Sequence, residues 1–308
     1  MNYDNYKMIK VDIKDMVGRV TMDRESVRNA MHVDVFSELA DAFTKLGYDR
    51  RAAVLVLTGA GDKAFAAGAD VKDIRDGACT DSMGGLKVCG EFGRMGQAMR
   101  TCGKPIIARV FGDIIGGGFE VLTFCDLAIA ADNSRFLAGE AFIGAVPVGT
   151  TQIASIVMGD KRARWLILTD DRIDAQTALD WGIVNKVVPF EKLDEEVDKL
   201  CKTLLNKFPW ALRFAKTQLN FWHDISTTSL YQGRDFWAMH VSNSAEMMEG
   251  TSAFLEKRPT DWKKFRDKDA AGVPSEYEFG PPLKTCQKCG AVHLPSDFEF
   301  CGKCGAEL

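Results

Sequence analysis

Gly116-Gly117-Gly118-Phe119-Glu120 follows an apolar run that ends at Val110, and Glu140 comes twenty residues later at the end of Phe136-Leu137-Ala138-Gly139-Glu140. The glycines leave backbone N–H groups bare, so these groups can hold a developing oxyanion. Two carboxylates in one apolar cleft beside them are the groups that move a proton and a water across an activated double bond. We therefore interpret the chain as an enzyme with Glu120 and Glu140 as its catalytic residues.

Apolar runs of strand type alternate with segments of helical periodicity on both sides of this stretch. The residues at 8–22 predict a hairpin that turns at Val17-Gly18, and 33–46 has helical spacing. Such alternation is typical of α/β proteins, whose ligands bind at the carboxyl ends of the strands. The segment 76–85 is polar and glycine-rich, and we expect it to be a mobile loop over that edge. Further strands are predicted at 52–58, 105–110, 126–130 and 185–188.

Composition and charge favour a soluble globular protein. The 308 residues are 46% hydrophobic and 27% charged, and the formal net charge of −4 comes from nearly balanced acids and bases. The overall charge therefore attracts neither a nucleic acid nor an anionic membrane surface. Residues 1–7 lack the basic and apolar regions of a signal peptide, and no uncharged apolar stretch reaches the ~18 residues of a membrane span. We expect a cytoplasmic protein without a nucleic-acid or membrane partner.

Strand signals end at Pro189, and the chain continues with amphipathic helical patterns rich in Trp and Phe. We expect this C-terminal helical block to pack against another subunit or another domain. Charged residues, glycine and proline then mark a linker at 267–283. The expected organisation is a catalytic domain at 1–266, the linker, and a small domain at 284–308. The helices of the block are predicted at 191–207, 209–222 and 228–255.

A second glycine-containing segment, Ala66-Ala67-Gly68-Ala69-Asp70, follows the strand predicted at 52–58. It supplies backbone N–H groups at the same edge as the Gly116–Gly118 turn. In this order, the two segments and the two glutamates resemble the crotonase (enoyl-CoA hydratase/isomerase) superfamily. The resemblance spans residues 8–265 and includes the motifs Asp23-Arg24, Arg28-Asn29-Ala30-Met31, Lys63-Ala64-Phe65, Cys125-Asp126-Leu127-Ala128, Trp181-Gly182-Ile183-Val184 and Phe254-Leu255-Glu256-Lys257-Arg258.

This resemblance implies both a fold and a substrate class. The fold is an α/β crotonase (ClpP-like) spiral of ββα units that ends in the C-terminal helical block. Members form trimers, commonly paired into hexamers, and bind acyl-coenzyme A thioesters. We therefore expect a homotrimer, paired into a dimer of trimers, that acts on an acyl-CoA thioester. Coenzyme A is then part of the substrate, and no redox cofactor is implied.

The same resemblance assigns roles to four residues. The N–H groups of Ala69 and Gly117 form an oxyanion hole that polarises the thioester carbonyl. Hydratases of this family hold one water between two carboxylates, so Glu120 activates the water that attacks the β carbon and Glu140 donates a proton to the α carbon. At least one carboxyl of such a buried pair has a raised pKa, which suits a proton donor. Isomerases typically keep only one of the two acids, so the pair favours an enoyl-CoA hydratase.

Contacts to the substrate are also implied by matching positions. Phe254 and Lys257 are expected to reach the nucleotide of a neighbouring subunit, and Arg28 is expected to meet a phosphate. After Glu140 the hydratases usually continue to Pro-Gly-Ala-Gly-Gly-Thr-Gln, whereas this chain has Pro147-Val148-Gly149-Thr150-Thr151-Gln152, whose valine adds bulk near the acyl pocket. The candidate residues for coenzyme A and substrate binding are Arg28, Ala67, Asp70, Val71, Lys72, Val148, Phe254 and Lys257.

Four of the nine cysteines lie in the last 23 residues, as two Cys-x-x-Cys-Gly turns with eleven residues between the pairs. Two such turns hold four thiolates tetrahedrally around Zn(II), so the spacing predicts a small four-cysteine zinc ribbon whose metal is structural. A rubredoxin-type iron site is the alternative. His293 lies in the spacer and is expected to be a surface side chain. The balanced charges of the ribbon favour a protein partner over nucleic acid. The expected ligands are Cys286, Cys289, Cys301 and Cys304.

Two alternatives stay open within the enzyme class. They are an enoyl-CoA isomerase and a hydrolase that acts on a coenzyme A thioester or a β-keto ring. In a different class, the chain is a crotonase-like scaffold that senses acyl-CoA and recruits a partner through the ribbon. Retention of both Glu120 and Glu140 argues against the scaffold.

Overall fold

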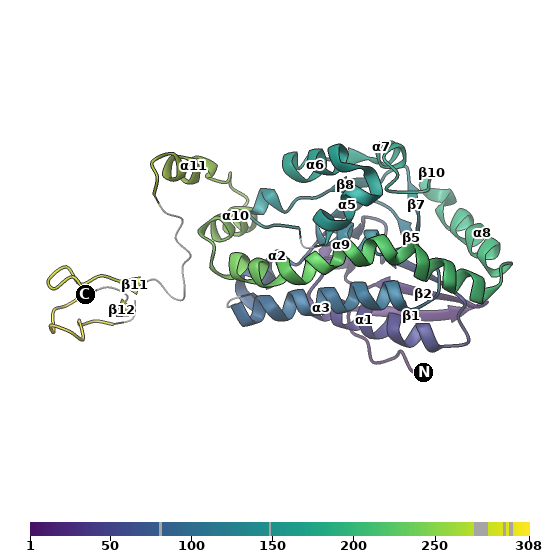
Figure 1. The fold of residues 1–308 in the computed structure, drawn as a ribbon, viewed down its shortest axis with the longest axis horizontal. Coiled ribbons are helices and arrows are strands. Elements are labelled where there is room, and N and C mark those ends of the chain that lie inside the picture. Colours follow the sequence, from purple (N-terminus) through teal and green to yellow (C-terminus); the bar gives the residue numbers. More distant parts are fainter. Residues whose placement is uncertain (80–81, 148, 274–282, 292–293, 296–297) are drawn as a thin grey trace.

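The computed structural model describes residues 1–79, 82–147, 149–273, 283–291, 294–295 and 298–308 (Figure 1). The main body of the protein is built on two β-sheets. The six strands of the first, in spatial order, are β1 (Ile9–Lys14), β2 (Val17–Met22), β3 (Val54–Gly59), β5 (Ile106–Val110), β7 (Leu127–Ala131) and β10 (Lys186–Val188). The four strands of the second are β4 (Ala64–Ala66), β6 (Asp113–Ile115), β8 (Arg135–Leu137) and β9 (Ile173–Asp174).

Before each helical segment the chain forms two consecutive strands, and the two strands belong to different sheets. β3 lies in the first sheet and β4 in the second, and the same holds for β5 and β6 and for β7 and β8. The strands along each sheet are parallel, except that β1 pairs antiparallel with β2 and β9 with β8. Repetition of this step makes the chain a spiral of ββα units, so the α/β fold predicted from the sequence is confirmed.

The first sheet is covered on both faces, which is why every residue of β3 is buried. Leu55 and Leu57 point into the larger core, where α1 (Val33–Tyr48) packs. Val54 and Val56 alternate to the other face, against α8 (Leu193–Leu205). The buried sheet therefore holds the ends of its strands in fixed positions, and it thereby positions the segments that follow each strand.

Helices follow the strands in chain order, and Figure 1 shows α1, α3 and α9 stacked side by side along one flank. The α-helices before the C-terminal block are α2 (Val71–Asp73), α3 (Ser82–Thr101), α4 (Gly117–Thr123), α5 (Thr150–Met158), α6 (Asp160–Thr169) and α7 (Ala175–Asp180). The short 3-10 and π helices are η1 (Glu25–Val27), η2 (Ile74–Ala78), η3 (Ala141–Ile143) and η4 (Phe190–Lys192).

Two sequence predictions in the N-terminal half were wrong in detail. The hairpin exists, but its turn lies at Asp15-Met16, which both have positive φ (51° and 63°), rather than at Val17-Gly18. Gly18 instead lies within β2, where a Cβ would meet Leu55. The predicted loop at 76–85 is largely helical, because η2 extends to Ala78 and α3 begins at Ser82. Residues 80–81 lie outside the described part.

The helices predicted at 209–222 and 228–255 are divided at another position. One long helix, α9 (Pro209–Asn243), continues past residue 222 because no proline or glycine interrupts the chain there. It ends at Ser244, whose side chain accepts a hydrogen bond from the Met247 N–H and caps α10 (Ala245–Glu256). The helical block is therefore confirmed, with its break in a different place.

Lys216 fastens α9 to the body. Its buried ammonium donates to Met99 O (2.8 Å) and Lys104 O (3.0 Å) and pairs with Asp126 Oδ2 at 2.8 Å. Asp126 Oδ2 also accepts the Ile106 N–H at 2.7 Å. A buried charge is tolerated when its donors are satisfied in this way. The contact links α9 to the end of α3 and to the first sheet.

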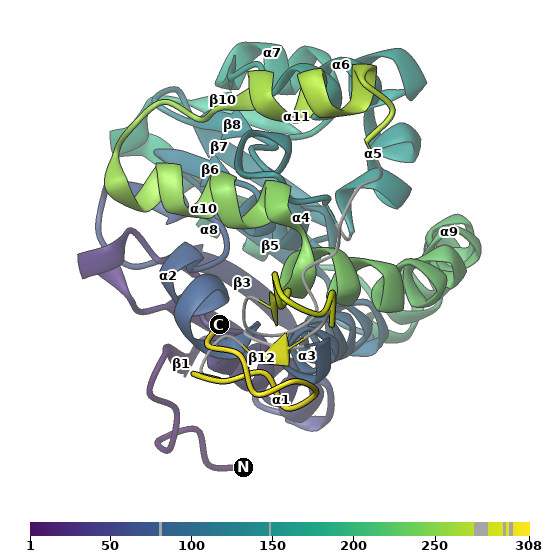
Figure 2. The ribbon, with the colours of Figure 1, turned by 90° about the vertical axis from the view of Figure 1, so that its left-hand side faces the viewer.

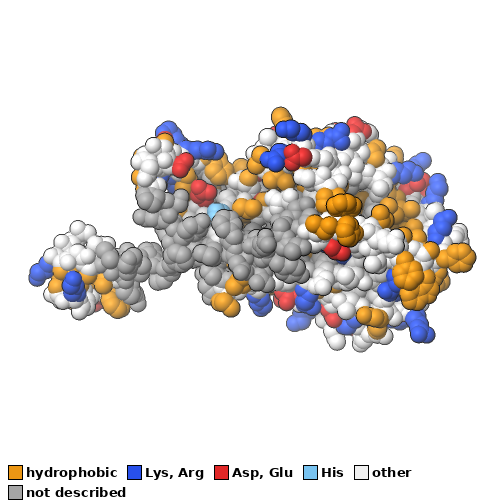
Figure 3. All heavy atoms as spheres, viewed as in Figure 1, with side chains coloured by type: hydrophobic (Ala, Val, Ile, Leu, Met, Phe, Trp, Pro, Cys, Tyr) orange, Lys and Arg blue, Asp and Glu red, His pale blue; other side chains and the backbone are white. Residues whose placement is uncertain are grey.

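Large hydrophobic side chains of α9 are exposed to solvent. Figure 3 shows hydrophobic side chains gathered toward the right-hand end of the molecule. Such a surface suits the subunit contact predicted for the helical block, which stays a prediction. Among the described residues, we find no helix with the length and apolar character of a membrane span. The exposed residues of α9 are Trp210, Phe214, Leu219, Phe221, Trp222 and Ile225.

The C-terminal residues form a separate small unit (Figures 1 and 2). It contains the antiparallel pair β11 (Leu283–Lys284) and β12 (Leu294–Pro295). Before it, α11 (Trp262–Ala270) includes the first four residues of the predicted linker. Asp261 caps the start of this helix by accepting the Lys264 N–H. Residues 274–282 of that linker, and His293, lie outside the described residues, so the domain boundaries stay a prediction.

Candidate active site

The Gly116–Gly118 turn joins β6 to α4, and each glycine has its own structural reason. Gly116 adopts φ 50° and ψ −122°, which side chains rarely permit. A Cβ on Gly118 would lie 2.4 Å from the Ala66 carbonyl oxygen, so the start of α4 packs directly on β4. Gly117 is the first residue of α4, and its N–H is one of the donors that a helix N-terminus leaves unpaired.

Ala69 is held beside this turn by backbone hydrogen bonds of its neighbours. The Met31 N–H donates to Gly68 O (2.8 Å), and the Asp70 N–H donates to Met31 O (3.0 Å). The Ala69 nitrogen lies 3.6 Å from the position that a Cβ on Gly117 would take. Within the described residues, neither the Ala69 N–H nor the Gly117 N–H has an acceptor in the chain. Two adjacent unused donors are the elements of an oxyanion hole.

Glu120 lies in the first turn of α4 and is only 5% exposed. Its Oε2 lies 4.0 Å from the same Cβ position on Gly117. Its Oε1 accepts a hydrogen bond from the Gly149 N–H, immediately before α5. A backbone donor of this kind stabilises negative charge on a carboxylate. The Glu120 carboxylate is therefore fixed next to the two unused N–H groups.

Glu140 follows the end of β8, and its side chain lies against the Gly116–Gly118 turn. Its Oε1 lies 3.1 Å from the position of a Cβ on Gly116, and its buried Oε2 has no hydrogen-bond partner among the described residues. Burial, followed by the negative charge of Glu120, raises the pKa of Glu140 well above its usual range. A raised pKa favours the protonated form of Glu140, which suits a proton donor. Ala69, Gly117, Glu120 and Glu140 come together at one turn.

This geometry agrees with a comparison of the sequence with known families. A family profile described as enoyl-CoA hydratase/isomerase matches residues 12–266. The chain belongs to the enoyl-CoA hydratase/isomerase family. The matched range contains both glutamates and ends before the cysteine tail, so the tail is an addition to the family domain.

Several solved structures resemble this chain over nearly their whole length. An enoyl-CoA hydratase from Mycobacterium avium subsp. paratuberculosis K-10 is 26% identical, with a TM-score of 0.73 over 83% of this chain and 99% of that one. An enoyl-CoA hydratase from Bacillus anthracis is 28% identical, with a TM-score of 0.67 over 83% and 99%. DspI from Pseudomonas aeruginosa is 29% identical, with a TM-score of 0.68 over 84% and 98%.

The residues predicted to contact coenzyme A in this family member begin beside Ala69. Ala67 precedes Ala69 in the chain, while Asp70, Val71 and Lys72 follow at the start of α2. Asp70 is occupied by other contacts, because it pairs with Arg24 (3.0 Å) and caps α2. Its substrate role stays a prediction. Val148 lies outside the described residues.

Phe254 and Lys257 lie at the end of α10, which contacts α2 of the same chain (Figure 2). Both side chains are exposed. Within one subunit they therefore flank the segment that carries Ala69, and their contact with a neighbouring subunit's nucleotide stays a prediction. Arg28 is exposed but pairs with Asp113 at 3.0 Å, so a phosphate would compete with that carboxylate.

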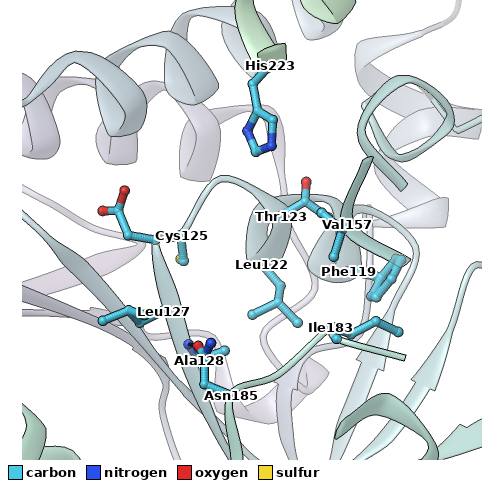
Figure 4. A pocket seen from close by; sticks show the side chains of 12 residues that line it. Phe119, Leu122, Thr123, Cys125, Leu127, Ala128, Val157, Ile183, Asn185 and His223 are labelled. Carbon is cyan, nitrogen blue, oxygen red and sulfur yellow. Dashed lines mark hydrogen bonds between the residues drawn. The ribbon is translucent and has the colours of Figure 1, made fainter. Parts of the chain in front are cut away.

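A cavity of about 250 Å³ lies along α4 and the start of β7 (Figure 4). Neither Glu120 nor Glu140 lines it. Two of its polar residues are already used in the fold, since Asp126 pairs with Lys216 and Asn185 Oδ1 accepts the Ala128 N–H at 2.8 Å. The cavity is therefore separate from the two glutamates that the sequence predicts to be catalytic.

Two residues that hold the acids were not identified from the sequence. The Gly149 N–H donates a hydrogen bond to Glu120. The one sequence feature that could have pointed to Gly149 is its place in the motif that follows Glu140. Asp170 accepts hydrogen bonds from the Gly139 and Phe142 N–H groups, one residue before and two after Glu140. No local pattern marks Asp170, because its contact depends on the pairing of distant strands.

The cysteine tail brings its four predicted ligands together. The sulfur atoms all lie within 4.8 Å of one another, and the pairs Cys286–Cys304 and Cys289–Cys301 are 3.6 Å apart. That spacing is far too long for a disulfide bond and fits the edge of a tetrahedron with Zn–S bonds of about 2.3 Å. The donor set therefore fits a tetrahedral metal site.

The raised pKa of Glu140 predicts a pH-dependent cost in stability. Unfolding lets Glu140 ionise near its ordinary pKa of 4.5, whereas the folded state retains the proton to higher pH. Wild-type stability should therefore fall as pH rises above about 4.5 toward the raised pKa. We expect Glu140→Gln to raise Tm by a few degrees at pH 7 and by much less at pH 4. Calorimetry at both values measures this, with the exposed Glu191→Gln as control; an equal change at both would contradict it.

Proposed function

We propose that the chain is an enoyl-CoA hydratase that adds water across the 2,3 double bond of a linear or cyclic unsaturated acyl-CoA thioester. One observation carries the proposal. Glu140, whose Oε2 is buried and whose pKa is raised, lies with Glu120 beside the unused N–H groups of Ala69 and Gly117. Hydration needs one acid, one base and an anion site for the thioester oxygen, and the pair supplies both proton-transfer groups.

In the proposed reaction, the thioester carbonyl accepts from the Ala69 and Gly117 N–H groups. Glu120 takes a proton from water as the water oxygen bonds to the β carbon. The electrons of the double bond move onto the thioester as an enolate, which the two N–H donors stabilise. Glu140 then gives its proton to the α carbon. Exchange with solvent afterwards removes the proton from Glu120 and returns a proton to Glu140.

The proposal also includes an assembly and a metal. We propose a homotrimer, paired into a dimer of trimers, because α9 exposes the apolar side chains described above. The molar mass in solution tests this. We propose structural Zn(II) in the four-cysteine site, since four thiolate ligands leave no open position for catalysis. We propose the cytoplasm as the compartment, since none of the nine cysteines forms a disulfide bond.

A panel of short linear and cyclic 2-enoyl-CoA thioesters tests the function. We expect loss of the conjugated thioester absorbance and formation of a 3-hydroxyacyl-CoA. Release of free coenzyme A would instead indicate a hydrolase, and a shifted double bond without added water would indicate an isomerase. Binding without turnover across the panel would favour an acyl-CoA-sensing scaffold.

A further inference from the structure

Asp170 is placed opposite the Glu140 segment by strand pairing. β8 and β9 are antiparallel, with Arg135 opposite Asp174 and Phe136 opposite Ile173. Continuation of that register beyond the paired residues places Asp170 opposite Gly139. Asp170 ends α6 in a left-handed conformation (φ 51°, ψ 32°), which turns the chain toward β9.

Both oxygens of the Asp170 carboxylate bind the backbone around Glu140. Oδ1 accepts from the Gly139 N–H and Oδ2 accepts from the Phe142 N–H, each at 2.7 Å. The side chain is half-buried, and burial raises the pKa of Asp170, whereas the two N–H donors lower it. Both bonds are charge-assisted in the ionised form of the carboxyl. A single carboxylate thus fixes the backbone on either side of the catalytic acid.

The opposite side of this segment is held by the C-terminal helices. The His240 ring donates from Nε2 to Gly144 O at 2.7 Å. A Cβ on Gly250 would lie 2.4 Å from Ile143 O, so α10 packs directly on η3. The Glu140 segment is therefore fixed between the end of α6 and the C-terminal helices.

We propose that Asp170 is a positioning residue that orients Glu140 for proton donation. The proposal rests on the proposed hydratase reaction. Its basis is the paired hydrogen bonds to Gly139 and Phe142 and the nearby negative charge of the carboxylate. The charge acts through space, since the negative charge of Asp170 adds to burial and to Glu120 in raising the pKa of Glu140.

Asp170→Asn tests the proposal with little risk to folding. Asparagine has the same shape and tolerates the left-handed backbone, but its amide can accept only one of the two N–H groups and carries no charge. We expect kcat for hydration to fall roughly 10- to 100-fold with little change in KM, because the donor is misplaced only in the chemical step. Asp170→Gly, which suits the same backbone, should show a similar loss.

The pH profile separates positioning from a general structural role. The charged or titratable residues of the described elements around Glu140 include Glu120 on α4, Arg135 on β8, Asp170 at the end of α6, Asp174 on β9, His240 on α9, and Glu246, Glu249 and Glu256 on α10. Of these, the charges of Glu120 and Asp170 raise the pKa of Glu140. Loss of the Asp170 charge lowers the pKa of Glu140, so the protonated acid is lost at lower pH. The alkaline limb of the kcat profile should therefore move down by roughly 0.5–1 pH unit in Asp170→Asn.

Asp171→Asn is the matched control, because the neighbouring Asp171 bonds to Trp165 Nε1 (2.8 Å) instead. We expect it to leave kcat and the pH profile unchanged. Hydrogen exchange of the backbone at 139–145 gives a readout independent of activity, and Asp170→Asn should accelerate it. An active wild type with an Asp170→Asn variant of normal kcat and pH profile would overturn the inference. If the wild type hydrates nothing, the proposed function fails, and unchanged exchange would reject positioning as well.

Discussion

Glu120→Gln and Glu140→Gln are each expected to lower kcat for hydration by about 10²- to 10⁴-fold, the usual contribution of a general acid or base. Glutamine keeps the size and most contacts of each side chain. It cannot take a proton from water at position 120, and it has no proton of comparable acidity to give at position 140. Steady-state hydration of the best substrate from the panel measures the loss.

The loss should be chemical rather than structural. Glu140→Gln is expected to be at least as stable as wild type at pH 7, because it removes a buried acid whose raised pKa costs stability. A large fall in kcat with an unchanged or higher Tm therefore identifies a catalytic role. The exposed Glu191→Gln should retain wild-type activity. A rate within a few-fold of wild type for either active-site variant would contradict its assigned role.

Cys301→Ser is expected to abolish stoichiometric metal binding and to unfold the C-terminal unit. The four sulfur atoms lie within 4.8 Å of one another, and a unit of this size has too small a core to fold without the metal. Elemental analysis should show about one zinc per wild-type chain and almost none in the variant. Limited proteolysis should cleave the residues after 283 in the variant and leave the body intact.

Cys125→Ser is a matched control for the metal experiment, because Cys125 is a thiol of the main body that bonds weakly to Val121 O. Metal content should be unchanged in this variant. Hydration should also persist in Cys301→Ser, since the family match ends before the cysteines. Stoichiometric zinc in Cys301→Ser would show that the ligand set is wrong, and stoichiometric iron in wild type would replace zinc with the rubredoxin-type alternative.

Much of the fold could be predicted from the sequence because the central strands are buried on both faces. The run 52–58 corresponds to β3, and the runs near 105 and 126 correspond to β5 and β7. In a globular protein, a continuous apolar run of this length is typical of a strand that is buried on both faces. The two glycine segments could be located for a similar reason, since only glycine allows the backbone of Gly116 and the approach of Gly118 to Ala66.

Local signals failed where a contact between distant residues decides the conformation. Asp15 and Met16 form a turn with positive φ although neither is glycine, because the pairing of β1 with β2 imposes it. Asp170 reaches Gly139 only through the register of β8 and β9. Such contacts cannot be predicted from periodicity.

One isotope measurement tests the central claim most directly. The enzyme is incubated with a 2-enoyl-CoA in ¹⁸O-labelled heavy water, and the product is analysed by mass spectrometry and NMR. The account predicts one ¹⁸O at the β carbon and one deuterium at the α carbon of a thioester that remains intact. Label in a free carboxylate, or a rearranged double bond without ¹⁸O, would contradict hydration by the Glu120–Glu140 pair.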